Sequence, residues 1–304
     1  VSAEIPLDEA QLPALLDRIK DLGAETIAIS LLHAYANPAH EKRLAALIQA
    51  ARPDLPISLS ADISPEIREY ERCSTTVLNA LLMPVVKAYL DRLEKRLGED
   101  GFSPLVFLVQ SNGGVCSLRM AAEQPARLLL SGPSGGALAA GRISELLDHP
   151  NLVAVDMGGT SYDVSVVQAG RVSVITQGEI DRLPVRLPMV EMRTIGAGGG
   201  SIARVDKLSR ITVGPDSAGS TPGPVCYGRG GTEPAVTDAN LALGKIDPAY
   251  FAGGKIPLDE AAAKSALQKH IGSRLGLKEF WPAAGVTEIV EENMANAARV
   301  HAIE

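Results

Sequence analysis

The residues best suited to chemistry stand in one short segment, Asp156-Met-Gly-Gly-Thr-Ser-Tyr-Asp163, between two apolar runs. Its adjacent glycines leave no Cβ over the backbone, so the amides are open to an anion, and Thr160 and Ser161 add hydroxyl donors beside them. Asp156 ends the preceding run and is the kind of ligand that a hydrated Mg²⁺ uses beside phosphates. The segment predicts a turn that binds phosphate and magnesium. By itself it fits an ordinary Gly-Gly hairpin with a solvated aspartate equally well.

A second glycine-rich segment is Gly196-Ala-Gly-Gly-Gly-Ser201. It is not a dinucleotide-binding fingerprint, because Ser201 replaces the third glycine and no strand-to-helix unit with a downstream acid surrounds it. A Walker-type loop is excluded as well, since Gly244-Lys245 is followed by Ile246. Two interpretations stay open: a turn that lets two lobes pack closely, or an anion-binding turn in the same phosphate cleft, formed by Gly198, Gly199 and Gly200.

Several elements are expected to position these turns. Residues 151–156, 162–167 and 171–176 have the apolar patterns of strands and predict a three-stranded antiparallel meander whose first turn is the candidate phosphate site. Residues 134–149 are rich in glycine and alanine, which predicts a helix that another backbone approaches closely. Farther upstream, the apolar spacing over residues 64–98 predicts one long helix.

The composition narrows the class of protein. Of 304 residues, 46% are hydrophobic and 21% charged, which predicts a folded, water-soluble chain of two domains or one large one. No wholly apolar run approaches the ~18 residues of a membrane span. The net charge is -7 and basic residues are scattered, so we expect neither nucleic acid nor a membrane as a partner. Three cysteines form no evident framework, and an odd number suits a reducing compartment, which favours the cytoplasm.

The order of the motifs resembles known families. The small-residue helix followed by the hairpin resembles the interdomain helix and second phosphate-binding hairpin of the actin, sugar-kinase and heat-shock chaperone ATPases. The whole series resembles the hydantoinase A/oxoprolinase family, which includes N-methylhydantoinases, 5-oxoprolinases and the nucleotide-binding subunits of ketone carboxylases. The motifs that carry this resemblance, besides the two glycine-rich turns, are Glu66-Ile-Arg-Glu-Tyr-Glu-Arg72, Ser111-Asn-Gly-Gly114, Ser131-Gly-Pro-Ser-Gly-Gly136, Pro222-Gly-Pro-Val-Cys-Tyr-Gly228 and Thr237-Asp-Ala-Asn240.

The resemblance implies an α/β protein with the actin-like ATPase fold, in which ATP lies between two lobes. It divides the chain into part of a first lobe at 1–133 with the long helix 64–98, an interlobe helix at 134–149, and a second ATPase lobe at 150–304 with the phosphate-binding hairpin. Family members begin with an Asp-Ile-Gly-Gly-Thr hairpin and continue into a Gly-Gly-Ala-Gly segment, and both are missing here. The chain is therefore expected to be a fragment of a larger one.

The resemblance also implies the reaction and its cofactors, ATP and Mg²⁺. The expected activity is ATP-dependent hydrolysis of a cyclic amide of the hydantoin or 5-oxoproline type, by phosphorylation of the carbonyl oxygen. One alternative is the nucleotide-binding subunit of an ATP-dependent carboxylase for a ketone of the acetone or acetophenone type. Another is a non-catalytic scaffold lobe. Each reading expects a hydantoinase B-type subunit or domain as partner.

The residues that the resemblance places in the site are those of the two turns. Phosphate is assigned to Gly158, Gly159, Thr160 and Ser161, with Gly198, Gly199 and Gly200 in the same cleft. Asp156 and Asp163 are assigned to Mg²⁺, and no catalytic side chain is assigned.

The remaining reactive residues favour structural roles. Glu69 and Arg72 match a family motif, but on a helix an ion pair or a solvated face is the default, with substrate contact as the alternative. Cys226 has no basic neighbour in the sequence that would activate it. The five histidines lack the spacing of metal ligands, namely His33, His40, His149, His270 and His301.

Overall fold

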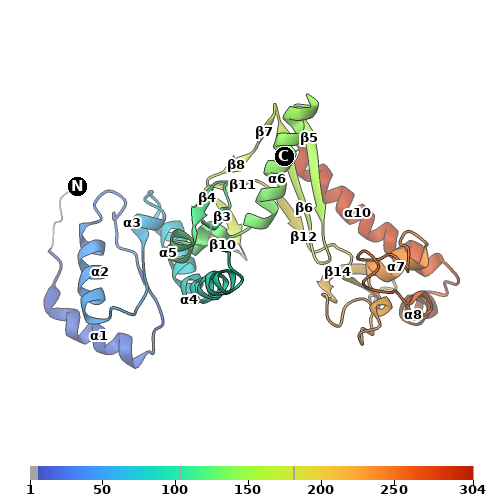
Figure 1. Ribbon diagram of the computed structural model, residues 1–304, viewed down its shortest axis with the longest axis horizontal. Coiled ribbons are helices and arrows are strands. Elements are labelled where there is room, and N and C mark those ends of the chain that lie inside the picture. The colour runs from blue at the N-terminus through green and yellow to red at the C-terminus, as the bar shows by residue number, and fades with distance from the viewer. Residues whose placement is uncertain (1–5, 103–104, 181, 304) are drawn as a thin grey trace. The chain divides into compact units, whose positions relative to one another are not determined.

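The computed structural model describes residues 6–102, 105–180 and 182–303 (Figure 1). Residues 1–5 of the predicted first lobe and Glu304 of the predicted second lobe lie outside the described residues. The chain divides into two compact units, one of residues 1–138 and 173–190, the other of residues 139–172 and 191–304. This division differs from the predicted boundaries at 133 and 150, because the connecting helix belongs to both units and residues 173–190 return to the first.

The first unit begins with a small α/β layer. Strands β1 (Ile27–Ile29) and β2 (Ile57–Leu59) pair in parallel, and α2 (Ala39–Ala51) supplies the crossover that a parallel pair requires. Helix α1 (Leu12–Asp21) follows a 3-10 turn at Glu9–Gln11. The buried core of this layer consists of Ile19, Ile29, Ile48 and Leu55.

The rest of the first unit consists of helices and short antiparallel pairs around a second apolar core. The helical elements are α3 (Ser60–Ile63), α4 (Glu69–Glu99), α5 (Leu118–Glu123) and a 3-10 turn at Pro125–Leu128. The strand pairs are β3 (Phe107–Val109) with β4 (Val115–Ser117), β8 (Val174–Ile175) with β11 (Met189–Val190), and β9 (Gly178–Ile180) with β10 (Leu183–Val185).

The long helix starts later than predicted, at Glu69 instead of residue 64. Ser64 precedes Pro65, and a residue before proline avoids helical backbone angles. Arg68 then adopts a φ of 78°, outside the helical region. The predicted helix 64–98 therefore corresponds to α4 alone, and residues 64–68 form a non-helical link to the preceding α3.

The inward face of α4 is polar over its first turns, whereas Ala80, Met83 and Leu90 are buried farther along the helix. Arg72 is completely buried, and its guanidinium donates to Ser60 Oγ at 3.0 Å, to the Leu31 carbonyl at 2.8 Å and to the Glu66 carbonyl at 3.0 Å. It also pairs with Glu69. Four of its five N–H donors bond within the unit and the side chain is completely buried, so Arg72 has the contacts of a structural residue, including the expected ion pair, and not those of a solvated face.

By length and composition alone, α4 is able to cross a membrane. It is the one helix of this kind in the part of the chain that the structure describes, and a third of its most apolar window is buried. The buried side chains include Arg72, Thr75 and Asn79, which hydrogen-bond to neighbouring segments of the same unit, and Thr76, which donates to the Arg72 carbonyl of α4 itself. These contacts are those of a helix packed within a protein domain.

Helix α6 (Ser131–Leu147) connects the two units and corresponds to the predicted helix 134–149. Its small residues do allow close approach: a Cβ placed on Gly141 would lie 3.0 Å from Val172 Cγ2.

The second unit is built on an antiparallel sheet. Strands β5 (Leu152–Met157) and β6 (Tyr162–Gln168) form a hairpin. Strand β12 (Arg193–Ile195) pairs with the other side of β6, and the short strand β7 (Arg171–Val172) pairs with the end of β6. The first two strands of the predicted meander are confirmed. The third is cut short, because the chain leaves the sheet after Val172.

A helical layer covers one face of this sheet and joins it to a second hairpin (Figure 1). The additional elements are β13 (Ser201–Val205) paired with β14 (Ile211–Ser217), a 3-10 turn at Val225–Tyr227, α7 (Val236–Ala242), α8 (Glu260–Leu267), a π-helical turn at Gln268–Gly272, α9 (Ser273–Leu275) and α10 (Trp281–Ile303). Tyr162 and Val164 of β6 pack against Val286, Val290 and Met294 of α10 in the core.

Replacing Arg72 with alanine is expected to lower the free energy of unfolding by about 3–5 kcal/mol, because Ser60, Leu31 and Glu69 then lose a buried charged partner. Arg119→Ala is the matched control, since that side chain is 87% exposed in its ion pair with Glu123 and is expected to change stability by less than ~0.5 kcal/mol. Urea titration measures both. Equal stability of the two variants would contradict the structural role.

Candidate functional site

The Asp156–Asp163 segment forms a tight turn between β5 and β6. The Gly158 amide donates to the Ser161 carbonyl at 3.1 Å, which closes the turn. Gly158, Gly159 and Thr160 are exposed. A Cβ placed on Gly158 or Gly159 would meet nothing within 4 Å, and neither glycine has the positive φ that favours this residue type. Packing therefore gives no reason for glycine at these positions, whereas the approach of a ligand to the backbone does.

The second glycine-rich turn packs directly against the first. Gly199 N donates to Gly158 O at 3.1 Å, and Gly200 N donates to Gly159 O at 2.6 Å. A Cβ on Gly198 would lie 2.7 Å from both Gly159 C and Thr160 N, closer than real contacts allow. The hairpin backbone thus rests on a surface that only glycine provides.

This arrangement corrects the expectation that Gly198, Gly199 and Gly200 bind phosphate through their amides. Gly198 N donates to Ser201 Oγ at 2.8 Å, and the other two amides are used by the hairpin. The turn at residues 196–201 therefore allows two segments to pack closely, which was the other interpretation of its sequence. These segments belong to the same unit and not to two lobes. The contribution of residues 196–201 is to hold the exposed turn in place.

Two residues that the sequence analysis did not single out complete the support. Thr237, at the start of α7, directs its amide and its hydroxyl to the Gly199 carbonyl at 2.7 and 2.8 Å. Ser217, at the end of β14, has its Oγ 3.3 Å from Thr160 Oγ1 and accepts from the Gly219 amide at 3.1 Å. Thr237 opens the Thr237-Asp-Ala-Asn240 motif and Ser217 lies outside the motifs of the family series, and only the folded chain shows which atoms they contact.

The two aspartates lie opposite each other. Asp156 pairs with Asp163 in the antiparallel register, and Asp163 also pairs with Thr194 of β12. Side chains of directly opposed residues share one face, with Cβ atoms about 4.5–5.5 Å apart. Because Tyr162 and Val164 face the core, the intervening Asp163 faces away from α10. Two carboxylates thus share the face of the hairpin turned away from α10, where Asp156 is exposed and Asp163 is half-buried.

The partners of the two carboxylates differ. Asp163 accepts from Thr194 Oγ1 at 2.5 Å and from Ser161 Oγ at 3.2 Å. Asp156 is exposed and makes no hydrogen bond or ion pair with any residue that the structure describes. Like charges opposite each other destabilise a strand pair, so a cation between them would relieve the repulsion.

The donor set fits a magnesium ion better than a metal held by protein alone. Among the described residues no cluster of three or more His, Cys, Asp and Glu side chains has the geometry of a metal site. Mg²⁺ usually keeps several waters and binds through one or two carboxylates plus substrate phosphates. The opposed pair beside an open turn meets that requirement, while the five histidines contribute no such cluster.

The other reactive candidates are structural. Cys226 is completely buried, and burial, with the nearby Asp238 carboxylate, raises the pKa of its thiol far above the usual range. Asp238 accepts from the amides of Ala235, Val225 and Cys226. The Thr-Asp-Ala-Asn motif therefore organises the preceding loop around the start of α7.

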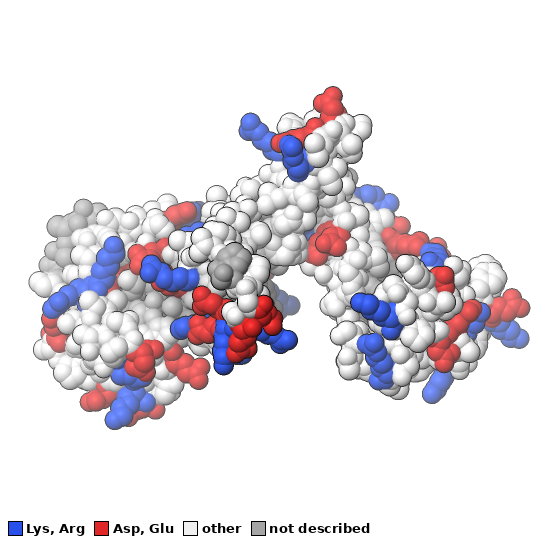
Figure 2. Space-filling view, viewed as in Figure 1, with Lys and Arg blue, Asp and Glu red and all other residues white. Residues whose placement is uncertain are grey.

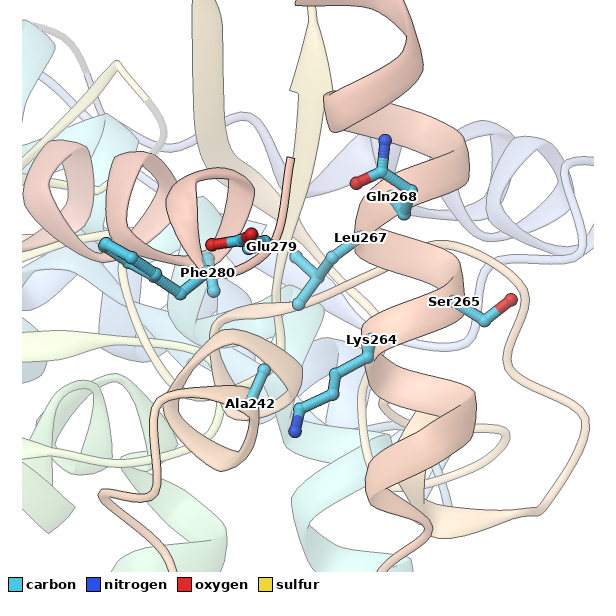
Figure 3. A pocket seen from close by; sticks show the side chains of 8 residues that line it. Ala242, Lys264, Ser265, Leu267, Gln268, Glu279 and Phe280 are labelled. Carbon is cyan, nitrogen blue, oxygen red and sulfur yellow. The ribbon is translucent and has the colours of Figure 1, made fainter. Parts of the chain in front are cut away.

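A cavity of about 500 Å³ lies between α7, α8 and the start of α10 (Figure 3). Figure 3 shows Lys264 and Leu267 extending from α8 toward Ala242 and Phe280, while Ser265 points away. Its lining is mainly apolar with a few polar groups, the composition typical of small-molecule sites. Helix α7 links it to the turns, because Thr237 contacts Gly199 and Ala242 lines the cavity.

Comparison with known proteins assigns the family. The chain matches the Hydantoinase/oxoprolinase family over residues 72–303 and the Hydantoinase/oxoprolinase N-terminal region over residues 1–51. The chain belongs to the hydantoinase/oxoprolinase family. The resemblance drawn from the motif series is thereby confirmed.

Individual relatives cover nearly all of the chain. It is 39% identical over 299 residues to caprolactamase subunit alpha of Pseudomonas jessenii, covering 98% of this chain and 43% of the relative. The acetophenone carboxylase gamma subunit of Aromatoleum aromaticum is 38% identical over 302 residues, covering 97% of this chain and 41% of the relative. The chain therefore spans less than half the length of these relatives.

Two solved structures share the fold. A nucleotide-free acetone carboxylase matches with a TM-score of 0.85 at 32% identity, covering 98% of this chain and 42% of that one. The ATP-dependent caprolactamase from Pseudomonas jessenii matches with a TM-score of 0.80 at 38% identity, covering 99% and 43%. The protein thus has the α/β fold of the hydantoinase family.

Substitution by alanine is expected to affect stability differently at a packed glycine and at an exposed one. Gly198→Ala is expected to lower the free energy of unfolding by about 1–3 kcal/mol, because the added carbon must displace the Gly159–Thr160 backbone. Gly158→Ala is expected to change it by less than ~0.5 kcal/mol, since the new carbon enters open space. Thermal and urea unfolding measure both. Equal destabilisation would show that the exposed turn is constrained by packing as well.

Proposed function

We propose that the turn at residues 156–163 binds the phosphates of ATP together with Mg²⁺. The observation that carries this proposal is the exposed Gly158–Gly159 backbone, held from behind by the second glycine turn and flanked by opposed carboxylates. Thr160 and Ser161 would donate to phosphate oxygens, and Asp156 and Asp163 would hold the ion through its waters. In an actin-like two-lobe fold, a second hairpin would grip the same phosphates.

The cavity beside α8 would hold the nucleoside. Five residues of α-helix separate Thr237 from Ala242, a rise of roughly 7.5 Å. The start of α7 thus lies at the second glycine turn and its end lies at the cavity. Lys264 and Gln268, two of the four polar residues that line the cavity beside Ser265 and Glu279, would orient the ring.

The proposed reaction is ATP-dependent opening of a cyclic amide. The carbonyl oxygen attacks the γ-phosphorus and ADP leaves, which converts a poor electrophile into one that water can attack. Water adds to the carbon, the C–N bond breaks as the nitrogen takes a proton, and the ring opens to an acyl phosphate. A second water then attacks the same carbon and displaces inorganic phosphate, which carries the original carbonyl oxygen and leaves the carboxylate. The site's part is positioning and charge neutralisation, which are the main tasks in phosphoryl transfer. The ATP-dependent caprolactamase among the relatives supports this choice.

Two other functions remain as alternatives to amide hydrolysis. Carboxylase subunits match at nearly the same identity as caprolactamase, so a subunit that activates a ketone by phosphorylation is the second candidate. The third is a scaffold lobe that binds no nucleotide by itself. In all three the protein works with a partner, as relatives named as subunits suggest, and we propose a hydantoinase B-type subunit or domain. The three unpaired cysteines suit a cytoplasmic setting.

Asp156→Asn is expected to weaken binding of ATP with Mg²⁺ at least tenfold, because it removes one of the two carboxylates that face the ion. Asp216→Asn is the control, since it removes an exposed charge close to Ser217 but outside the turn. Isothermal titration calorimetry measures both, with ATP alone as a further comparison. Identical heats for wild type and Asp156→Asn would favour the scaffold alternative.

The amide mechanism predicts the fate of one oxygen atom. With the full-length enzyme and a lactam or hydantoin labelled with ¹⁸O at its carbonyl, the label is expected in inorganic phosphate, because phosphorylation makes that oxygen part of the leaving group. Mass spectrometry of the released phosphate measures it. Turnover that requires a ketone and bicarbonate instead would establish the carboxylase alternative.

A further inference from the structure

A loop of residues 217–223 follows β14 and lies beside the candidate phosphate turn, within the same unit. Ser217, its first residue, has its Oγ 3.3 Å from Thr160 Oγ1 of the turn. The Ala218 amide donates to the Gly200 carbonyl at 2.8 Å. The loop is therefore attached to both glycine-rich turns of the candidate site.

Arg229 stands at the tip of the next loop and reaches back to the first. It is exposed, and it lies between Gly228 and Gly230, whose φ angles of 66° and 94° are in the left-handed region. Its Nη1 donates to the Ser220 carbonyl in a long hydrogen bond of 3.4 Å. Its guanidinium group lies 5.7 Å from the centroid of the Tyr227 ring. These are weak contacts for a charged side chain.

The contact with Ser220 places the guanidinium group near the phosphate turn. Ser217 and Ser220 are three residues apart, which span at most about 11 Å of chain. Exposed side chains change rotamer rapidly. A Cβ placed on Gly228 or Gly230 would meet nothing within 4 Å, so packing does not restrain the backbone on either side of the arginine. Arg229 is thus able to move toward a ligand in the turn.

The base of the arginine loop is fixed, although its tip is open. The amides of Val225 and Cys226 donate to the Asp238 carboxylate at 3.1 and 2.7 Å. Asp238 follows Thr237, which holds the second glycine turn through the Gly199 carbonyl. The start of α7 therefore positions the arginine loop and the phosphate turn together.

The charge of Arg229 is not neutralised within its unit. It forms no ion pair with any carboxylate in the described part of the chain. Arg204 of β13 shows the contrast, since it pairs with Glu233 at 2.8 Å and with Asp216 at 2.5 Å. Acidic and basic side chains are interspersed over this unit (Figure 2). An unpaired cation beside a turn that would receive phosphates is available to an anionic ligand.

We propose that Arg229 is a catalytic residue that stabilises the γ-phosphoryl group of ATP during its transfer. The inference deepens the proposed function and rests on it for the presence of ATP in the turn. As the carbonyl oxygen bonds to the γ-phosphorus, the bond from phosphorus to the bridging oxygen breaks, and its electron pair leaves with ADP. The guanidinium group donates to the phosphoryl and leaving oxygens, where negative charge develops.

The first experiment measures turnover by the full-length enzyme with its partner subunit, as phosphate released with a lactam, hydantoin or ketone on which the wild type is active. Arg229→Ala is expected to lower kcat at least ~100-fold, because an arginine at the transferred phosphoryl group supplies ~10³–10⁵-fold in rate. Arg229→Met, which keeps the length of the side chain without its charge, is expected to lose as much. Unchanged kcat in both variants overturns the proposal.

The matched control is Arg210→Ala. Arg210 lies at the other end of β14 and pairs with Asp206 at the surface, so kcat is expected to stay at the wild-type value. An equal loss of kcat in this variant overturns the proposal, because the effect would then belong to any surface arginine of the unit.

The second experiment separates catalysis from binding and from stability. Calorimetry is expected to give Arg229→Ala a Kd for ATP with Mg²⁺ within ~threefold of the wild type, because the contact strengthens mainly in the transition state. The unfolding midpoint is expected to match as well. A structural role would move the midpoint and the Kd together with kcat, and that result overturns the proposal. Weaker ATP binding at unchanged kcat also overturns it.

The two proposals on this site fail in different ways. A wild type that binds no ATP contradicts the phosphate site and, with it, the role of Arg229. A wild type that binds and uses ATP, with Arg229→Ala equally active, contradicts the role of Arg229 alone.

Discussion

Two hydrogen bonds between backbone atoms determine the candidate site. They run from the amides of Gly199 and Gly200 to the carbonyls of Gly158 and Gly159, and they attach an exposed turn to the interior of its unit. The turn has few other means of support, because its own side is open and its glycines have no side chains to pack. The second glycine turn is in turn held by Thr237 at the start of α7, so the position of the phosphate site depends on the helical layer behind it.

The first unit uses a different kind of constraint. Its long helix is oriented by buried polar groups, with Arg72 and Asn79 reaching segments far away in the sequence. Apolar packing is tolerant of small rotations, whereas hydrogen bonds are directional and fail when a helix turns. Polar contacts thus position the distinctive element of each unit. In the second unit they are backbone hydrogen bonds that hold the exposed turn, and in the first they are side-chain hydrogen bonds that orient α4.

The parts of the fold that could be predicted from the sequence are those set by local patterns. The β5–β6 hairpin, its exposed turn and the small-residue helix were all expected, because strand alternation, paired glycines and helical spacing act over a few residues. Helix α4 was expected as a helix, yet its apolar periodicity gave no indication that its polar side would be buried over the first turns. That outcome depends on Ser58, Leu31 and Ala126, which only the folded chain brings to it.

The sequence predicted which residues form the candidate site, but not which atoms they contact. Asp156 and Asp163 were assigned together, and the strand register explains how they face each other. The role expected for Gly198, Gly199 and Gly200 was wrong, because a glycine that admits a ligand and one that admits a neighbouring backbone look alike in a sequence. About forty residues separate this turn from the hairpin, so local patterns carry no information on their contact.

The register of the hairpin has a consequence for the variation that it can tolerate. Side chains alternate between the two faces of β6, so one inserted or deleted residue within the turn would exchange the places of Asp163 and Tyr162. A carboxylate would enter the apolar layer against α10, and an aromatic ring would take its place on the open side. The strand register thus constrains the length of the loop, in addition to the constraint that the proposed ligand places on its residues, and descendants of this gene should show no insertions or deletions there.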